Sequence, residues 1–262
     1  MLIVLGILLP CLILLFSGDQ GSKSIISTVM NAIGLLIAIF FMYKGMNPIL
    51  VTALSCIYIC AVTIFYQNEV NIKSKISFIS VLLVLCVMVP VIYYTADVSS
   101  IQGFTKEQYE ITDSNGYLRD IDINMILVQI CVMIIALIGT VIDIAVAVSS
   151  SMYEICHNNP DIKKNQLFIA GMNVGKDVLS TSIHTIFYIY IAEYLTLMLQ
   201  FTESYSFAKM INSKAFCQEF ITISISGIGC CLILPVVTLM GVALLTKRDK
   251  RIDVTKRAAN KG

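Results

Sequence analysis

The sequence predicts an all-α integral membrane protein, and three observations support that class. Hydrophobic residues make up 57% of the 262 residues and charged residues only 13%, whereas an average soluble domain is about 25% charged. The mean hydropathy is +0.84. Apolar runs close to or above 20 residues recur, which is the length a helix needs to cross about 30 Å of hydrocarbon. We expect one transmembrane domain over residues 1–246 and a basic cytoplasmic tail over 247–262.

Seven transmembrane helices are predicted, because each apolar run ends at a polar elbow or a turn. Lys44 to Pro48, for example, forms a tight turn with Gly and Pro breakers. The longest interior polar segment is acidic and spans 96–122. The expected helices are 1–16, 25–43, 46–66, 76–95, 123–153, 174–198 and 220–246.

A short amphipathic helix is predicted in the membrane interface, between the fifth and sixth spans. We expect Asn159 to cap it, with Pro160 at its first position and Asp161 in its first turn. Leu167 and Phe168 give it an apolar side that would rest on the bilayer.

The distribution of Lys and Arg predicts the orientation. Cytoplasmic loops of membrane proteins carry an excess of these residues. If the tail is cytoplasmic, seven spans place the loops 17–24, 67–75 and 155–175 on the same side. Thirteen of the 18 basic residues then face the cytoplasm and five face outward. We therefore expect the N-terminus outside and the C-terminus inside.

Several kinds of chemistry are not expected. Seven of the nine cysteines lie in apolar runs, where Cys behaves as a small hydrophobe. Cys56 and Cys60 share a helical face but have no further ligand, so no metal or disulfide framework is predicted. The chain has no hydrolase triad, Walker motif or dinucleotide fingerprint, so we expect neither an enzyme nor a cofactor. The only basic cluster follows a span directly, which argues against nucleic-acid binding.

Asp143 is the sharpest feature of the predicted fifth helix. A charged carboxylate at bilayer depth costs at least about 2.5–3.5 kcal/mol, and such acids are functional by default. Two interpretations are open: Asp143 binds and releases protons, or its protonated carboxyl hydrogen-bonds across helices and holds the fold together. Gly139 and Ala147 flank it at i−4 and i+4, a small-residue stripe that permits close helix approach.

The predicted sixth helix carries a polar face. Its candidate proton-relay or substrate-path residues follow at i, i+4, i+7 and i+11, with Thr185 beside them: Asp177, Thr181, His184 and Tyr188. His184 is either a relay that titrates near neutral pH or a neutral core imidazole. The hydroxyl groups either relay protons or bond back to their own helix.

A depth argument predicts that Asp143 and His184 pair. Asp143 lies eleven residues from Glu154, and His184 lies eight from Lys176, which is about 16 Å and about 12 Å at 1.5 Å per residue. If Glu154 and Lys176 both mark the cytoplasmic interface, the carboxyl and the imidazole lie at similar depth on antiparallel neighbouring helices.

The predicted seventh helix contains Gly227, Gly229 and Pro235. These residues indicate either a kinked or broken helix, which transporters use to expose backbone to substrate, or sites of close helix packing.

The central stretch resembles the YibE/F family of bacterial multi-pass membrane proteins, in its shorter, domain-free form. The resemblance implies the bacterial plasma membrane. The residues that carry it are Gly139-x-Val141-x-Asp143, Ala145, Ser149, Ser150, Glu154, Asn159-Pro160, Gly171-Met172-Asn173-x-Gly175-x-Asp177 and Thr181-x-x-x-Thr185.

The same stretch is also similar to the fourth and fifth helices of a resistance-nodulation-division transporter half, including SecD and SecF. This similarity implies that Asp143 couples proton flux to work, with Thr181 or Thr185 as hydroxyl partners. The chain departs from those transporters because it has one Asp where many drug pumps have two, and because it lacks the large porter domain. A second copy or a paralogue would supply the missing part.

We therefore expect a permease or transport-complex subunit in the lipid bilayer, proton-coupled through Asp143 and His184. It would act as a homodimer or as a heterodimer with a longer paralogous subunit. The alternative is a scaffold that transports nothing and binds a partner membrane protein.

Overall fold

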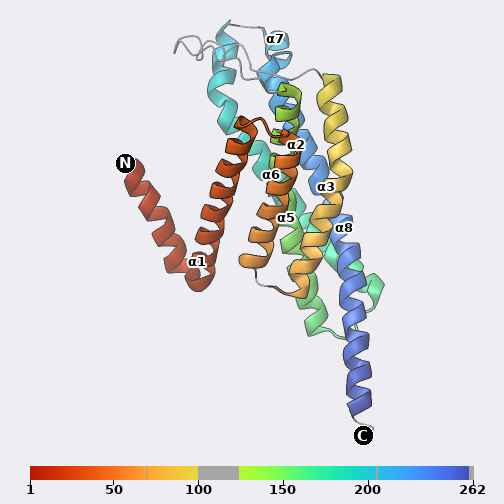
Figure 1. Cartoon of the computed structure of the whole chain (residues 1–262). Helices are drawn as coiled ribbons and strands as arrows, with labels where there is room; N and C mark the ends of the chain where they lie inside the picture. The colour runs from red at the N-terminus through yellow and green to blue at the C-terminus, as the bar shows by residue number, and fades with distance from the viewer. Residues whose placement is uncertain (69, 100–123, 205, 260–262) are drawn as a thin grey trace.

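The computed structural model describes residues 1–68, 70–99, 124–204 and 206–259. Every regular element in these ranges is helical (Figure 1). The elements are α1 (Leu2–Tyr43), α2 (Pro48–Ala61), the π-helical turn η1 (Val62–Tyr66), α3 (Ile72–Ser99), α5 (Met125–Asn158), α6 (Lys164–Ser204), α7 (Phe207–Ile211) and α8 (Lys214–Ala259).

Five helical segments are long and apolar enough to cross a membrane: Val4–Tyr43, Pro48–Tyr66, Ile72–Ser99, Ile126–Asn158 and Phe216–Thr246. This finding confirms the all-α membrane class. The number of spans and their orientation stay predictions. Most of the acidic segment 96–122 lies outside the described residues.

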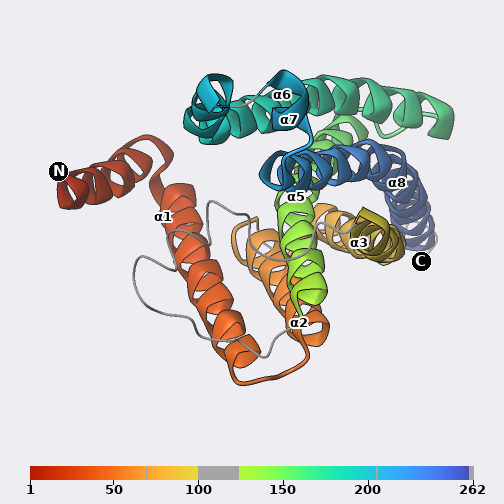
Figure 2. The ribbon, with the colours of Figure 1, turned by 90° about the horizontal axis from the view of Figure 1, so that it is seen from above.

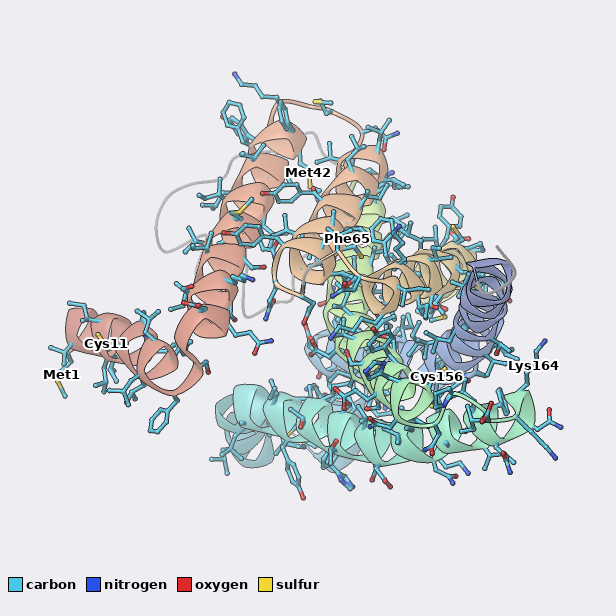
Figure 3. All side chains as sticks on the ribbon, turned by 90° about the horizontal axis from the view of Figure 1, so that it is seen from below. Met1, Cys11, Met42, Phe65, Cys156 and Lys164 are labelled. Atoms are coloured by element: carbon cyan, nitrogen blue, oxygen red, sulfur yellow. The ribbon has the colours of Figure 1, made fainter. Side chains whose placement is uncertain are left out.

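The first two predicted helices form one element with a sharp corner. Gly18 has φ 52° and ψ −129°, a conformation that glycine adopts at little cost. Gly21 then packs against the preceding arm, since a Cβ there would lie 2.6 Å from the Ile13 carbonyl oxygen. The elbow predicted over 17–24 is therefore a corner at Gly18, and the rest of that segment is helical and not a loop. Figure 3 shows Met1 and Cys11 on an arm set apart from the bundle.

The turn after α1 is built as predicted. Gly45 has φ 84°, and the Asn47 side chain accepts a hydrogen bond of 3.0 Å from the Ile49 amide. Pro48 occupies the first helical position.

The separate interfacial helix predicted after α5 is not present. Residues 159–163 form a turn in which the Ile162 amide donates to the Asn159 carbonyl at 3.2 Å, so no helix begins after Asn159, which is instead the C-terminal cap of α5. α6 instead runs unbroken from Lys164, ten residues before the predicted start. Its first turns pack on the bundle: Leu167 is buried, and a Cβ at Gly171 would lie 2.7 Å from the Met152 sulfur. This packing explains why the segment continues into the span.

α5 is the central helix, and α2, α3, α6 and α8 are arranged around it (Figure 2). α1 packs against α2 and η1. The core follows the inner sides of α5, where Leu137, Val141, Val148 and Met152 have no exposed surface.

α8 is continuous through Gly227, Gly229 and Pro235, so of the two interpretations left open for these residues the structure excludes a break in the helix. Gly229 permits close packing on α5, because a Cβ there would overlap the Leu137 side chain. Gly227, in contrast, has nothing within 4 Å of the position its Cβ would take. α8 also continues to Ala259, so most of the predicted tail extends this helix, and 260–262 lie outside the described residues.

Buried hydroxyl groups join α3 to α5. Ser77 Oγ lies 2.6 Å from Ser149 Oγ and donates to the Ala145 carbonyl at 3.2 Å. Both serines also reach carbonyls of their own helices, Lys73 for Ser77 and Val146 for Ser149. Every polar atom of the pair is therefore satisfied without water.

Replacement of Gly229 by Leu is expected to destabilise the bundle by about 1–3 kcal/mol, because the new side chain overpacks the contact with Leu137. Gly227→Leu is the matched control on the same helix, where open space accepts the side chain. Thermal unfolding of both variants in detergent measures the difference. Equal melting temperatures would contradict this account of α5–α8 packing.

The Ser77–Ser149 contact is expected to contribute about 0.6 kcal/mol, the average for interhelical hydrogen bonds in a membrane protein. A double-mutant cycle of Ser77→Ala and Ser149→Ala isolates this coupling from the bonds that each serine makes to its own helix. Additive free energies of unfolding would show that the two hydroxyl groups do not interact.

Candidate functional site

Asp143 lies near the middle of the α5 span, seventeen residues from Ile126 and fifteen from Asn158. Its side chain is on the exposed surface of the bundle and not in the core. Within the described ranges it makes no hydrogen bond or ion pair. The carboxyl therefore faces outward near the middle of a candidate membrane span.

One turn away, Gly139 is exposed as well, and a Cβ there would meet nothing within 4 Å. None of the described residues therefore makes the close helix approach predicted at Gly139. Ala147, one turn to the other side of Asp143, is half-buried. Gly139 and Asp143 form an exposed patch, which we call the α5 stripe.

The α5 stripe borders α8 on one side. Cys230 of α8 lies near Asp143 and beside Thr140. The Thr140 hydroxyl donates to the Leu137 carbonyl of its own helix at 2.9 Å. Thr140 and Cys230 are thus the polar neighbours of Asp143 that sequence spacing did not reveal, because Cys230 comes from a helix far along the chain.

The five relay or substrate-path candidates predicted on α6 all lie on its exposed surface: Asp177, Thr181, His184, Thr185 and Tyr188. The threonine hydroxyl groups bond back to their own helix. Thr181 donates to the Val178 carbonyl at 2.9 Å, and Thr185 donates to the Thr181 carbonyl at 2.9 Å. Of the two roles left open for these hydroxyl groups, the structure shows the bond to the helix backbone.

His184 is not a core imidazole, because its side chain is exposed. No hydrogen bond or ion pair joins it to Asp143 among the residues that the structure describes. The expected pair is therefore not formed within this chain.

The register between α5 and α6 explains that result. Gly171 lies against Met152 and Gly175 against Val148, so each step along α6 matches one step back along α5. Five residues beyond Gly175 on α6 is Ser180, and five residues before Val148 on α5 is Asp143, so the register places Asp143 level with Ser180. Thr181 is the next residue of α6. His184 lies four residues beyond Ser180, about 6 Å along the helix axis at 1.5 Å per residue.

α6 starts at Lys164, so Lys176 is already in its fourth turn. By the same register Glu154 is level with residue 169, seven residues before Lys176, so the expected position of His184 was about two turns too close to the start of α6. Glu154 and Lys176 are both exposed, and no ion pair links them in the described part of the chain. They are not equivalent markers of one membrane surface.

The serine row Ser74, Ser77 and Ser80 on α3 was missed by the sequence analysis. All three are buried. Their i, i+3, i+6 spacing inside an apolar run was the signal available, since it places them on one helix face. The region holds no group of three His, Cys, Asp or Glu side chains suited to a metal, and neither does the rest of the described chain.

Comparisons with known proteins bear on the family. Neither the search of curated proteins nor the search of solved structures found a match. The family model of YibE/F-like proteins matches residues 5–247, which cover most of the chain and all of the α5 and α6 residues discussed above. The chain therefore belongs to the YibE/F-like protein family.

Proposed function

We propose that this chain is a non-enzymatic subunit of a membrane transport complex in the bacterial plasma membrane, with Asp143 as the group that binds and releases protons. One observation carries the proposal: an ionisable side chain lies at mid-span of the central helix and faces outward. A charged carboxylate there costs at least about 2.5–3.5 kcal/mol, so it is neutral, covered by protein or in contact with water. A change between these states is what proton coupling requires.

A second membrane subunit would supply the protein that covers Asp143. Gly139 leaves open space beside Asp143, and small residues of this kind let two helices approach closely. The covering subunit is a second copy or a longer paralogue. Because Thr181 lies one residue beyond the position level with Asp143 and His184 lies one turn beyond that position, the relay would run from Asp143 along the exposed side of α6 toward His184.

The proposed topology has seven spans, with the N-terminus outside and the C-terminus inside. The corner at Gly18 supports this number, since it divides α1 into two arms. There are then seven helical segments: the two arms of α1, α2 together with η1, α3, α5, α6 and α8. The excess of Lys and Arg on the side of the tail supports the orientation.

The second candidate function is a scaffold that transports nothing and binds another membrane protein. The open space at Gly139 favours it, because an unfilled approach site is equally what an assembly surface needs. In that case the Asp143 carboxyl would serve only to hydrogen-bond the partner.

A hydrophobic carbodiimide tests the protonation of Asp143. This reagent enters the bilayer and reacts with protonated carboxyl groups, so we expect Asp143 to be modified and the modification to fall as pH rises. Peptide mass spectrometry after labelling at several pH values measures it, with Asp143→Asn as the control. Equal modification of Asp143 and of the exposed Glu154 at every pH would contradict the proposed site.

Substitutions at the α5 stripe separate the two candidate functions. If protons are coupled here, Asp143→Asn abolishes dissipation of an imposed pH gradient in proteoliposomes that contain the assembled complex, and assembly is unchanged. Gly139→Leu is expected to impair assembly, which chemical crosslinking in the membrane measures. Full proton flux with Asp143→Asn would refute coupling at this residue. Loss of assembly with Gly139→Leu, together with a silent Asp143→Asn, would establish the scaffold.

A further inference from the structure

An apolar groove of about 430 Å³ lies between α6 and α8. Ile183, Ile186 and Phe187 form its α6 wall, while Gly227 and Ile228 lie on its α8 wall. The groove belongs to a different side of α6 from the Asp177 face, so it is separate from the site at Asp143.

The groove exists because the two helices separate along their length. At Gly175, α6 is in direct contact with Leu234 of α8. Two turns farther along α6 the contact opens, and Gly227 leaves unfilled space where any other residue would place a side chain. The groove is thus formed by the absence of one side chain between two helices that touch elsewhere.

Its position is within the hydrocarbon layer. Its α8 wall runs from Ile223 to Leu232, inside the candidate span Phe216–Thr246. Ile223 is seven residues from one end of that span and Leu232 fourteen from the other, about 10 Å and about 21 Å at 1.5 Å per residue. A molecule in the groove would therefore be surrounded by lipid on its open side.

The lining of the groove is not suited to binding a polar molecule. No charged side chain contributes to it. The hydroxyl of Ser224, which also lines it, already donates to the Phe220 carbonyl at 2.7 Å. The thiol of Cys231 is the other polar group.

We propose that this groove binds a single hydrocarbon chain of a membrane lipid. Its volume falls within the range of about 300–1,000 Å³ that is typical of ligand pockets. The lining is apolar on both walls and the open side faces the hydrocarbon layer, which suits a hydrocarbon chain. The proposal holds whether or not the chain transports anything.

Photolabelling of the full chain in proteoliposomes tests it. The vesicles contain phosphatidylethanolamine and phosphatidylglycerol with a trace of phosphatidylcholine that carries a diazirine in the middle of one acyl chain. After illumination, peptide mass spectrometry should show several-fold more label on 183–187 and 223–232 than on the exposed α3 face at Ile79, Leu83 and Val87. Equal labelling of the two regions would overturn the proposal.

A matched pair of substitutions sharpens the test. Gly227→Leu fills the groove and should lower its labelling several-fold to the level of α3, whereas Gly6→Leu, also at an open position, should change nothing. Unchanged labelling in a folded Gly227→Leu variant would refute a specific site. If that variant does not fold, the comparison of the groove with α3 in the unsubstituted chain decides the question. A short thiol crosslinker applied to a chain with Cys11, Cys86, Cys156 and Cys217 replaced by Ser, which leaves Cys231 as the one cysteine that is not buried, should not join Cys231 to Cys231. A crosslinked dimer would show that a second copy occupies the groove.

Discussion

The central helix α5 has to satisfy two opposing demands, and the rest of the structure depends on how it does so. On its inner sides it is packed to exclude all solvent, with Val141 and Ala145 fully buried. On its outer side, within the same turns, it carries Asp143. A carboxyl is tolerated there because the helix turns its apolar sides toward α3 and α8 and leaves one narrow stripe to the surroundings.

Small residues let the neighbouring helices close around α5 on those inner sides. Gly171 and Gly175 bring α6 against Met152 and Val148, and Gly229 brings α8 against Leu137. Without a hydrophobic driving force between helices in lipid, such contacts depend on close packing and on hydrogen bonds such as that between Ser77 and Ser149. Glycines that do not face a neighbour, Gly139 and Gly227, mark instead the surfaces open to other molecules.

Those two open glycines lie in different chemical settings. Gly139 adjoins an ionisable group on α5, whereas Gly227 lies in the apolar groove between α6 and α8. The chain thus has a polar and an apolar surface at bilayer depth, on different helices. Membership of the YibE/F-like family covers both surfaces, since the matched region is 5–247.

The sequence by itself determined the membrane class, the turn at Lys44 to Pro48, the family and the identity of the polar residues. Apolar run length, turn residues and motifs are local properties, so they can be read without coordinates. It could not determine that one glycine joins the first two helices, that α6 begins ten residues early, or that His184 lies a turn beyond Asp143. Only the tertiary structure decided which face of α5 is buried, because small residues at i−4 and i+4 suit a packed helix face and an open one equally well. Which of the two they form depends on helices that lie far away in the chain.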